Sequence, residues 1–363
     1  MDILVKHNII KSDKYIIDAG THSTKILEVH YGSKTVTVKK AMKIENTMYD
    51  KDEGFNFHDL ARRVDEMTNG RARKNILISL PHQLTESRII TIKNKKESEI
   101  PRIIKREYMS YGHVTPLTHI VDYAFLGKRE EAGDTVSYYL ISAVKKSIAT
   151  ELVDAFEERK LRIRRIVSSV YTRVCLAELL FNDYENLNRI MIDIGANSSR
   201  ILAFADGVPV YLRDSETGFQ SYIDSVFNSQ TKAGITDIKN ALNELGEMSE
   251  LDMELYTKYF NTLDRDIYKN CIEEVDRSII QETERIINLC SSNNTQISKI
   301  FITGHTLPGF AEKLARYFGI DVMFLEFKDW DETEGRDYIL QVDDAGIDDS
   351  YSNAVGLAVS PMI

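Results

Sequence analysis

Two short stretches of the chain repeat a set of residues that could hold a phosphate group and its metal ion. YIIDAGTHSTKILEV fills positions 15–29, and IMIDIGANSSRILAF fills positions 190–204. Aligning the two stretches matches Asp18 with Asp193, Gly20 with Gly195, Ser23 with Ser198, and Lys25 with Arg200. In each stretch an apolar run ends in an aspartate, and a turn with a glycine and hydroxyl residues follows.

This combination has the chemistry of a magnesium polyphosphate site. Glycine lets a phosphate approach main-chain amides closely, and Mg²⁺ keeps several waters while taking one or two carboxylates. We therefore predict that Asp18 and Asp193 are the metal ligands. Donors to phosphate oxygens are expected at Thr21, Ser23, Thr24, Asn197, Ser198 and Ser199.

A single turn of this kind is common in β-structure, so the repetition carries the prediction. Two turns in equivalent positions would clamp one polyphosphate from both sides. A Walker A loop is not the explanation, because the sequence contains no GxxxxGK[ST] motif.

Strands and helices must position these turns. Apolar alternation predicts three strands over YIIDAG, TKILEVHYG and KTVTVKKAMKI, then a helix with Phe57 and Leu60 on its apolar face, then a buried strand NILISLP at 75–81. Residues 82–162 read as an inserted β-α-β-β-α module. A long helical region is expected over about 218–290, a βαβ unit over 300–327, and a small-residue helix over 353–363. The acidic segment 326–349 is interpreted as a solvated surface loop.

Composition narrows the function classes. The 363 residues are enough for two or so domains, and 43% apolar with 28% charged residues is typical of a soluble globular protein. A net charge of −10 argues against a nucleic-acid binder. The three cysteines are distant from one another and are expected as reduced core thiols. The sequence has neither a signal peptide nor an apolar run that could span a membrane, so we expect a cytoplasmic protein.

The repeated stretches resemble the phosphate-1 and phosphate-2 motifs of the actin, sugar-kinase and DnaK-type ATPase superfamily. IFITGHTLPGFAEKL (300–314) resembles its adenosine motif, while SSVYTRVCLAELL (168–180) and NAVGLAVS (353–360) resemble its two connecting helices. Each element is a weak signal, but all five occur in the family's order. The resemblance implies an α/β actin-like ATPase fold, with two RNase H-like domains that each hold a mixed five-stranded sheet.

The place of the insert selects a branch. A module between phosphate 1 and connect 1, entered through NILISLP, resembles the 1C subdomain of the FtsA/PilM branch. EVDRSI (274–279) resembles the EIQRSL-type helix of PilM-like proteins, although any amphipathic helix would show the same apolar spacing. FtsA-like proteins end in a membrane-targeting helix, whereas this sequence stops after connect 2, so the resemblance favours the PilM family and no direct membrane insertion.

This resemblance implies a domain plan and a set of cofactor contacts. The domain I core is expected at 13–81 and 163–190, the 1C subdomain at 82–162, the domain II core at 190–220 and 291–363, and a mostly helical 2B subdomain at 221–290. Together with the residues above, contacts to ATP are expected from Gly20, His22, Lys25, Gly195, Ala196, Gly218, Glu274, Arg277, Ser278, Gly304 and His305. His22 and His305 depart from the family pattern, and they either contact the nucleotide or are tolerated loop residues. The departures also leave open a degenerate pocket that binds nucleotide weakly.

Family members bind Mg·ATP and hold the short cytoplasmic tail of the bitopic membrane protein PilN. The resemblance thus implies a scaffold of the type IV pilus platform, held at the inner face of the membrane through partners. Contacts with other platform proteins, with the assembly ATPase or with further copies of the chain are left open. The basic run KNKKESEIPRIIKR (93–106) is either a solvated helix face or a partner contact.

Catalysis is a separate question. Connect 1 opens with Ser168 and Ser169, neither of which is a general base, and we assign no catalytic residue although Asp193 or Glu216 could serve. Slow hydrolysis or none is expected. Two alternatives remain at this point: an FtsA-like filament-forming ATPase, and a small-molecule kinase, for which we find no substrate-side aspartate.

Overall fold

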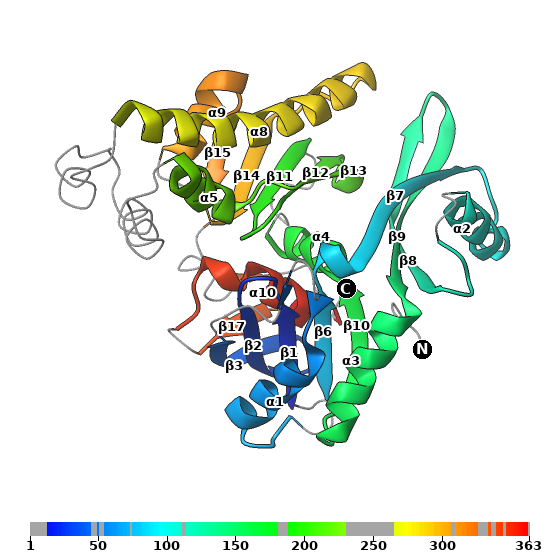
Figure 1. Ribbon diagram of the computed structural model, residues 1–363. Coiled ribbons are helices and arrows are strands. Elements are labelled where there is room, and N and C mark those ends of the chain that lie inside the picture. Colours follow the sequence, from blue (N-terminus) through cyan, green and yellow to red (C-terminus); the bar gives the residue numbers. More distant parts are fainter. Residues whose placement is uncertain are drawn as a thin grey trace. The chain divides into compact units, whose positions relative to one another are not determined.

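The computed structural model describes residues 13–44, 49–50, 54–72, 75–110, 114–180, 188–229, 265–305, 309–325, 333–334, 339–343 and 346–361. The chain divides into two compact units. The first draws on Met1–Glu185 and Glu326–Ile363, and the second spans Asn186–Leu325. Each unit is built around its own β-sheet (Figure 1).

The sheet of the first unit carries the first phosphate turn. Its seven strands run in the order β10-β6-β1-β2-β3-β17-β16. Strands β1, β2 and β3 form an antiparallel meander, and β6 and β10 extend the sheet in parallel with β1. The bounds are β1 Asp13–Ala19, β2 Thr24–Tyr31, β3 Thr35–Ile44, β6 Ile76–Leu80, β10 Ile163–Ser168, β16 Thr333–Glu334 and β17 Ile339–Val342. Every residue of β6 is buried, as expected for a parallel strand covered on both faces.

In the part of the chain that the structure describes, four helices cover this sheet. They are α1 Phe57–Thr68, α3 Lys146–Glu158, α4 Ser169–Leu180 and α10 Ser352–Val359. Helices α1 and α3 pack together, and α10 packs against α4, β1 and β2. Short elements complete the unit: β4 Tyr49–Asp50, β5 Gly54–Phe55, and the 3₁₀ turns η1 His82–Leu84 and η5 Asp349–Tyr351.

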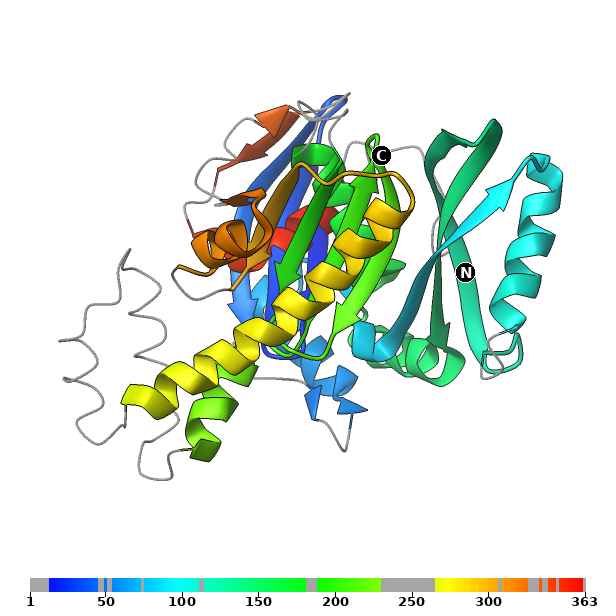
Figure 2. The same ribbon diagram turned by 90° about the horizontal axis from the view of Figure 1, so that it is seen from above.

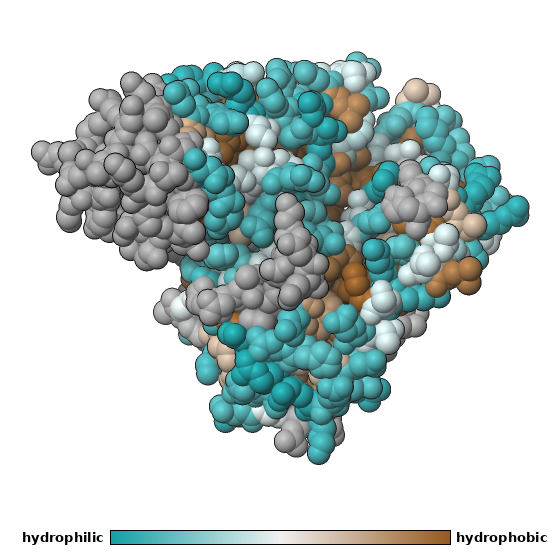
Figure 3. All heavy atoms as spheres, viewed as in Figure 1, coloured by the Kyte–Doolittle hydropathy of each residue, from teal (hydrophilic) through white to brown (hydrophobic). Residues whose placement is uncertain are grey.

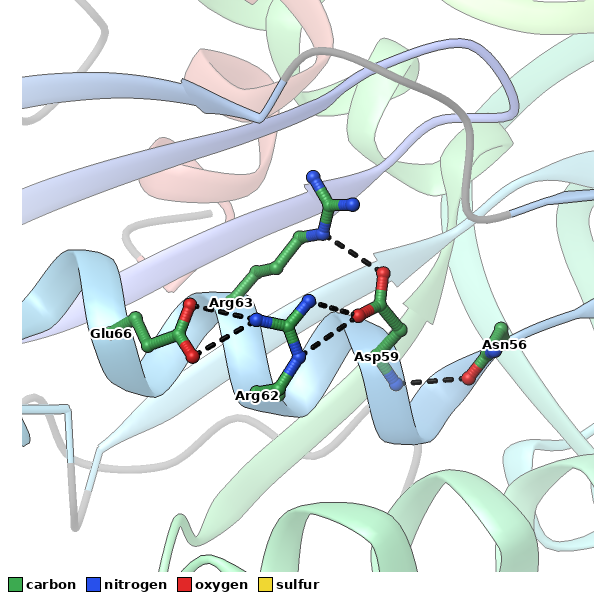
Figure 4. Close-up of polar contacts among 5 residues, drawn as sticks. All are labelled: Asn56, Asp59, Arg62, Arg63 and Glu66. Atoms are coloured by element: carbon green, nitrogen blue, oxygen red, sulfur yellow. Dashed lines mark hydrogen bonds and ion pairs between the residues drawn. The ribbon is translucent and has the colours of Figure 1, made fainter.

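Helix α1 begins with a well-defined cap (Figure 4). The Asn56 side chain accepts a hydrogen bond from the Asp59 main-chain N–H at 2.9 Å, which satisfies one of the donors left open at a helix start. The Asp59 carboxylate bonds Arg62 and Arg63, and Arg62 also bonds both oxygens of Glu66 at 2.9 Å. Acidic and basic residues spaced three and four apart thus reinforce the first turns.

The predicted insert is a separate sheet with a helix on one face. Strands β7 Thr85–Lys93, β8 His119–Glu131 and β9 Asp134–Lys145 take the order β7-β9-β8. The 3₁₀ turn η2 Glu97–Glu99 and helix α2 Ile100–Met109 lie between β7 and β8 in the chain. Ile100, Ile104 and Tyr108 of α2 pack with Tyr139 and Ile141 of β9. The helix predicted as the last element of the insert is α3. Its Leu152 and Phe156 lie in the hydrophobic core of the first unit's main sheet and not in the core of the insert.

The second unit repeats the meander and its two parallel neighbours. Its five strands run β13-β12-β11-β14-β15, the same connectivity as β3-β2-β1-β6-β10. The bounds are β11 Arg189–Ile194, β12 Ser199–Ala205, β13 Val208–Ser215, β14 Lys299–Gly304 and β15 Asp321–Phe324, with helices α5 Phe219–Ser229, α8 Arg265–Ser292 and α9 Phe310–Phe318. Figure 2 shows α8 running along this sheet, where it contacts β12 and β13. Residues 230–264 of the predicted helical subdomain lie outside the described residues.

The segment after residue 325 departs from the sequence-based expectation. We expected 326–349 to be a solvated loop and assigned 291–363 to the second domain. Instead β17 pairs in parallel with β3, and 326–363 group with the first unit. The reason is the short run ILQV inside the acidic segment, whose Leu340 is fully buried. The first sheet therefore has seven strands rather than the expected five.

The distribution of polar and apolar residues agrees with the composition of a globular protein. The face drawn in Figure 3 is mainly hydrophilic, with small separate hydrophobic patches. Among the described residues no helix is long and apolar enough to cross a membrane. Cys175, Cys271 and Cys290 are buried thiols, as expected for core residues.

Candidate functional site

Asp18 is the last residue but one of β1, and two neighbouring elements hold its side chain. In the parallel register of β1 and β6 it lies beside Ser79, whose Oγ donates a hydrogen bond to Asp18 Oδ1 at 2.7 Å. The Asn353 side-chain amide, on α10, donates to the same oxygen. The Asp18 side chain is buried, with 6% of the residue exposed. Its orientation is therefore set by β6 and α10 together.

Asp193 occupies the equivalent place in the second unit. In the parallel register of β11 and β14 it lies beside Thr303, whose Oγ1 donates to Asp193 Oδ1 at 2.9 Å. Only 4% of Asp193 is exposed. Both units thus place a buried carboxylate at the end of a central strand and fix it with a hydroxyl from the parallel neighbour.

The cations opposite the two aspartates differ in their surroundings. Lys25 on β2 lies opposite Asp18 and Arg200 on β12 lies opposite Asp193, so each pair shares one face of its sheet. Lys25 Nζ lies 4.0 Å from where a Cβ on Gly20 would be, beside the first turn. Burial lowers the pKa of Arg200, while the Asp214 carboxylate at 2.5 Å opposes that shift. Arg200 therefore belongs to an ion pair within its sheet.

The first turn, between β1 and β2, is tight enough to require its glycine. A Cβ at Gly20 would lie 2.4 Å from the Ser23 carbonyl oxygen. Thr21, Ser23 and Thr24 are buried and His22 is exposed. Among the described residues the buried Thr24 Oγ1 has no hydrogen-bond partner. A hydroxyl of this kind fits a bound oxygen-rich group, because buried polar atoms are otherwise nearly always paired.

The second turn, between β11 and β12, is braced by the start of α5. Gly195 N–H bonds the Ser198 carbonyl at 2.9 Å, and Phe219 and Gln220 donate their N–H groups to the carbonyls of Gly195 and Ala196 at 2.9 and 2.7 Å. A further brace comes from Ser199 Oγ, which donates to the Thr217 carbonyl at 2.6 Å. Gly218 is needed because a Cβ there would lie 2.4 Å from Ser198 N. Its role is close packing, and the amides that follow it hold the turn.

Gly304 ends β14 beside the same turn, and His305 follows it directly. Gly304 has a φ of +85°, and a Cβ there would lie 2.2 Å from the Ile194 carbonyl oxygen. The His305 N–H donates to that same carbonyl at 2.9 Å. The His305 ring is exposed, and its centroid lies 5.7 Å from that of Phe219 on α5. Residues 306–308 of the predicted adenosine motif lie outside the described residues.

Helix α8 contributes one predicted residue to this neighbourhood. Ser278 Oγ lies 2.8 Å from Thr217 Oγ1, just after β13. Glu274 and Arg277 are exposed on the same helix. A buried aspartate that the sequence analysis missed, Asp276, accepts a hydrogen bond from Tyr222 Oη at 2.7 Å and pairs with Lys313 Nζ at 2.5 Å. These contacts tie α8 to α5 and α9.

Comparison with known proteins assigns the chain to a family. The family model for the type IV pilus assembly protein PilM matches residues 16–361. The chain belongs to the PilM family.

Solved structures of other proteins share the fold of this chain. A PilM-PilN type IV pilus biogenesis complex matches with a TM-score of 0.75 at 14% identity, covering 98% of this chain and all of that one. Ethanolamine utilization protein EutJ from Carboxydothermus hydrogenoformans matches with a TM-score of 0.50 at 13% identity, covering 98% and 92%. At these identities the likeness concerns the fold, which is actin-like as predicted. Among curated proteins a sequence comparison finds no match.

Within this PilM-family fold the predicted residues fall into two groups. One surrounds the first turn, with Asp18, Lys25 and the residues between them. The other surrounds the second turn and includes Asp193, Gly218, Ser278, Gly304 and His305. The described residues contain no cluster of three or more His, Cys, Asp or Glu side chains that could hold a metal. Single carboxylates with nearby hydroxyls suit a hydrated Mg²⁺ better than a metal that needs an all-protein cage.

Four residues that position Asp18 and Asp193 were not predicted. They are Ser79, Thr303, Asn353 and Thr172, the last of which donates its hydroxyl to Asn353. A signal for two of them was present: NILISLP and IFITG each carry a hydroxyl residue near the end of an apolar strand. Asn353 and Thr172 sit in helices whose small residues indicated only close packing.

Proposed function

We propose that this PilM-family chain binds Mg·ATP through the two turns and acts as a scaffold in type IV pilus assembly. The observation that carries the proposal is the repeated carboxylate and hydroxyl pair, Asp18 with Ser79 and Asp193 with Thr303, at the ends of equivalent strands. A buried carboxylate fixed by a hydroxyl keeps one orientation without a ligand. Such preorganisation suits a hydrated cation whose waters need fixed acceptors.

The phosphate groups are assigned to the turns themselves. Glycine at Gly20 and Gly195 keeps each turn tight, and the hydroxyl and amide groups of the turns supply donors. Lys25 adds a positive charge beside the first turn. For the base and sugar we propose His305, Glu274 and Arg277, because a guanidinium or imidazole can stack on or hydrogen-bond a nucleoside.

Hydrolysis is not part of the proposed role. At the start of α4 the Ser168 hydroxyl lies 2.9 Å from the Ser142 hydroxyl, and the Ser169 carbonyl accepts from Thr172 and Arg173. These groups hold the strand-to-helix junction and none of them is a base. We propose that nucleotide serves as a structural or switching ligand with slow turnover or none.

The proposed partner is the cytoplasmic N-terminal tail of a PilN-like membrane protein. Family membership and the fold shared with a PilM-PilN complex support this assignment. In this proposal the chain lies at the cytoplasmic face of the inner membrane and is held there by that partner. The exposed basic side chains of α2, Arg102, Lys105 and Arg106, offer a complementary surface to an acidic partner segment or headgroup.

Nucleotide binding can be tested by calorimetry with Asp18→Asn and Asp193→Asn. Each change keeps the side-chain shape and removes the charge that Mg²⁺ requires, so we expect the Kd for Mg·ATP to rise at least about tenfold. Asp13→Asn is a matched control, since Asp13 is on the same strand β1 but exposed and paired with His30 and Lys39. Unchanged affinities in both variants would contradict the proposed site.

Partner binding can be tested separately by fluorescence anisotropy. The probe is a labelled peptide with the cytoplasmic N-terminal tail of a PilN-like membrane protein, and a scrambled peptide is the control. We expect the peptide with the native sequence to bind this protein saturably and the scrambled peptide not to bind. ATP-dependent sedimentation of the protein without peptide binding would instead indicate a filament-forming ATPase.

A further inference from the structure

A path of three side chains leads from Asp18 to the crossing of two helices. The Asn353 amide on α10 donates to Asp18 Oδ1, and Thr172 Oγ1 on α4 donates to Asn353 Oδ1. All three residues are buried, and Thr172 is fully so. The path lies entirely within the first unit.

The chemistry of the path fixes the orientation of the Asn353 amide. A carboxylate can only accept hydrogen bonds, so the NH₂ group of Asn353 must face Asp18 and its oxygen must face Thr172. The Thr172 hydroxyl is shared between that oxygen and the Ser169 carbonyl at 2.7 Å. Ser79 Oγ completes the cluster at 3.3 Å from Asn353 Nδ2. Rotating the Asn353 amide by half a turn would break both its hydrogen bond to Asp18 and the hydrogen bond it accepts from Thr172.

The helices that carry Asn353 and Thr172 meet main chain to main chain. Gly356, one turn after Asn353, comes so close to α4 that a Cβ there would lie 2.1 Å from the Thr172 carbonyl oxygen. At the far end of α10 the Tyr31 hydroxyl donates to the Ala358 carbonyl at 2.6 Å. Helix α10 is thus held to β1 through Asn353 and to β2 through Tyr31. Its contact with α4 is so close that a side chain at position 356 would not fit between the two main chains.

We propose that Asn353 is a positioning residue that couples the Asp18 carboxylate to the α4–α10 crossing. A cation near Asp18 competes for the carboxylate oxygen that the Asn353 amide uses, so binding there changes how firmly α10 is held. In return, a disturbance at Thr172 changes the geometry that Asp18 offers to a cation. The ligand half of this inference rests on the proposed Mg·ATP binding, whereas the coupling itself does not.

Two substitutions at one position separate hydrogen bonding from packing. Thr172→Val keeps the shape of the side chain and removes its hydroxyl, while Thr172→Ser keeps the hydroxyl and removes a methyl group. Thr68→Val is the control, because Thr68 is also buried and also bonds a carbonyl in its own helix, Val64 O at 2.7 Å, away from the path.

The first experiment is hydrogen exchange of the α10 amides in the protein without nucleotide. We expect Thr172→Val to speed exchange about tenfold, and Thr172→Ser and Thr68→Val to leave it near that of the unmodified chain. Combined with Asp18→Asn, the Thr172→Val effect should shrink, because coupled residues are non-additive. Fully additive effects, or a Thr172→Ser effect larger than that of Thr172→Val, would overturn the proposal.

The second experiment measures affinity for ATP with Mg²⁺ and with EDTA. We expect Thr172→Val to weaken binding of Mg·ATP and to leave binding of metal-free ATP unchanged, with Thr172→Ser restoring the first. If the unmodified chain binds no nucleotide, the proposed function fails while the exchange result still decides the coupling. Equal losses with and without Mg²⁺ would show a general packing defect and overturn the proposal.

Discussion

Gly304 is the residue at which a single added methyl group should cost most beside the second turn. Its φ of +85° disfavours any other residue, and an added Cβ would meet the Ile194 carbonyl at 2.2 Å. We expect Gly304→Ala to lower the free energy of unfolding of the second unit by about 2–4 kcal/mol, adding backbone strain and a steric clash. Urea unfolding monitored within that unit measures it.

Gly319 supplies the matched control for this prediction. It also has a positive φ, +65°, at the end of α9, but an added Cβ would meet nothing within 4 Å. Gly319→Ala should therefore cost only about 1 kcal/mol from backbone conformation. Equal losses at the two positions would mean that the contact with Ile194 does not contribute.

At the residue scale, a repeated pattern in the sequence singles out Asp18 and Asp193, but the sequence did not predict which residues hold their side chains. Asp18 and Asp193 follow apolar runs and precede glycine turns, a local pattern that repetition makes visible. Ser79, Thr303 and Asn353 reach those carboxylates through strand register and helix packing. Residues that meet in the fold but lie far apart in the chain produce no regular spacing in the sequence, so a single sequence does not reveal them.

At the element scale, helix α1 should make stability depend on pH. Partial burial raises the pKa of the Asp59 carboxyl, but hydrogen bonds from Arg62 and Arg63 outweigh it and hold the pKa below its usual value. The stabilisation is therefore complete above the unfolded-state pKa of about 4 and is lost as pH falls through the lower folded-state value. Asp59→Asn should reduce the melting temperature at pH 7, and the difference from the unmodified chain should vanish near pH 2–3. A difference that persists at acidic pH would contradict the ion-pair account.

The junction of α5, α8 and α9 depends on Tyr222 and Asp276. Tyr222→Phe would leave the buried Asp276 carboxylate with only Lys313 among its two described partners. We expect a loss of about 1–3 kcal/mol, since a buried charged acceptor would lose a donor. Tyr317→Phe on the exposed end of α9 is the control and should change stability by less than about 0.5 kcal/mol. Thermal unfolding of the two variants gives the comparison.

Helices and strands whose apolar residues recur at a regular spacing could be predicted from the sequence. A strand that forms only because it pairs with another strand could not. Phe57, Leu60 and Val64 recur at helical spacing and are buried on α1 as expected. Strand β17 is only Ile339–Val342, in a segment where acidic residues dominate, and it becomes a strand by pairing with β3. Four residues offer too short a pattern to outweigh their surroundings.

At the scale of the whole molecule, β17 should be necessary for the stability of the first unit. Leu340→Ala removes a fully buried side chain from the seven-stranded sheet and should cost about 2–5 kcal/mol. Asp343→Ala, at the exposed end of the same segment, keeps the main-chain bond from Asp343 N to Val38 O and should cost little. Hydrogen exchange of β3 and β17 reports the effect directly. A Leu340→Ala effect confined to the second unit would contradict this assignment.

The route of the chain has a consequence for the order in which the protein can be completed on the ribosome. The second unit is one continuous stretch, Asn186–Leu325, whereas the first needs β17 and α10, which are translated after all of it. Until α10 emerges, Asp18 lacks the Asn353 amide and the Tyr31 hydroxyl lacks its carbonyl. The unit whose synthesis begins first is therefore the one finished last. Until then the edge of β3 that β17 pairs with and the face of α4 that α10 covers are exposed, and a chaperone would be needed there.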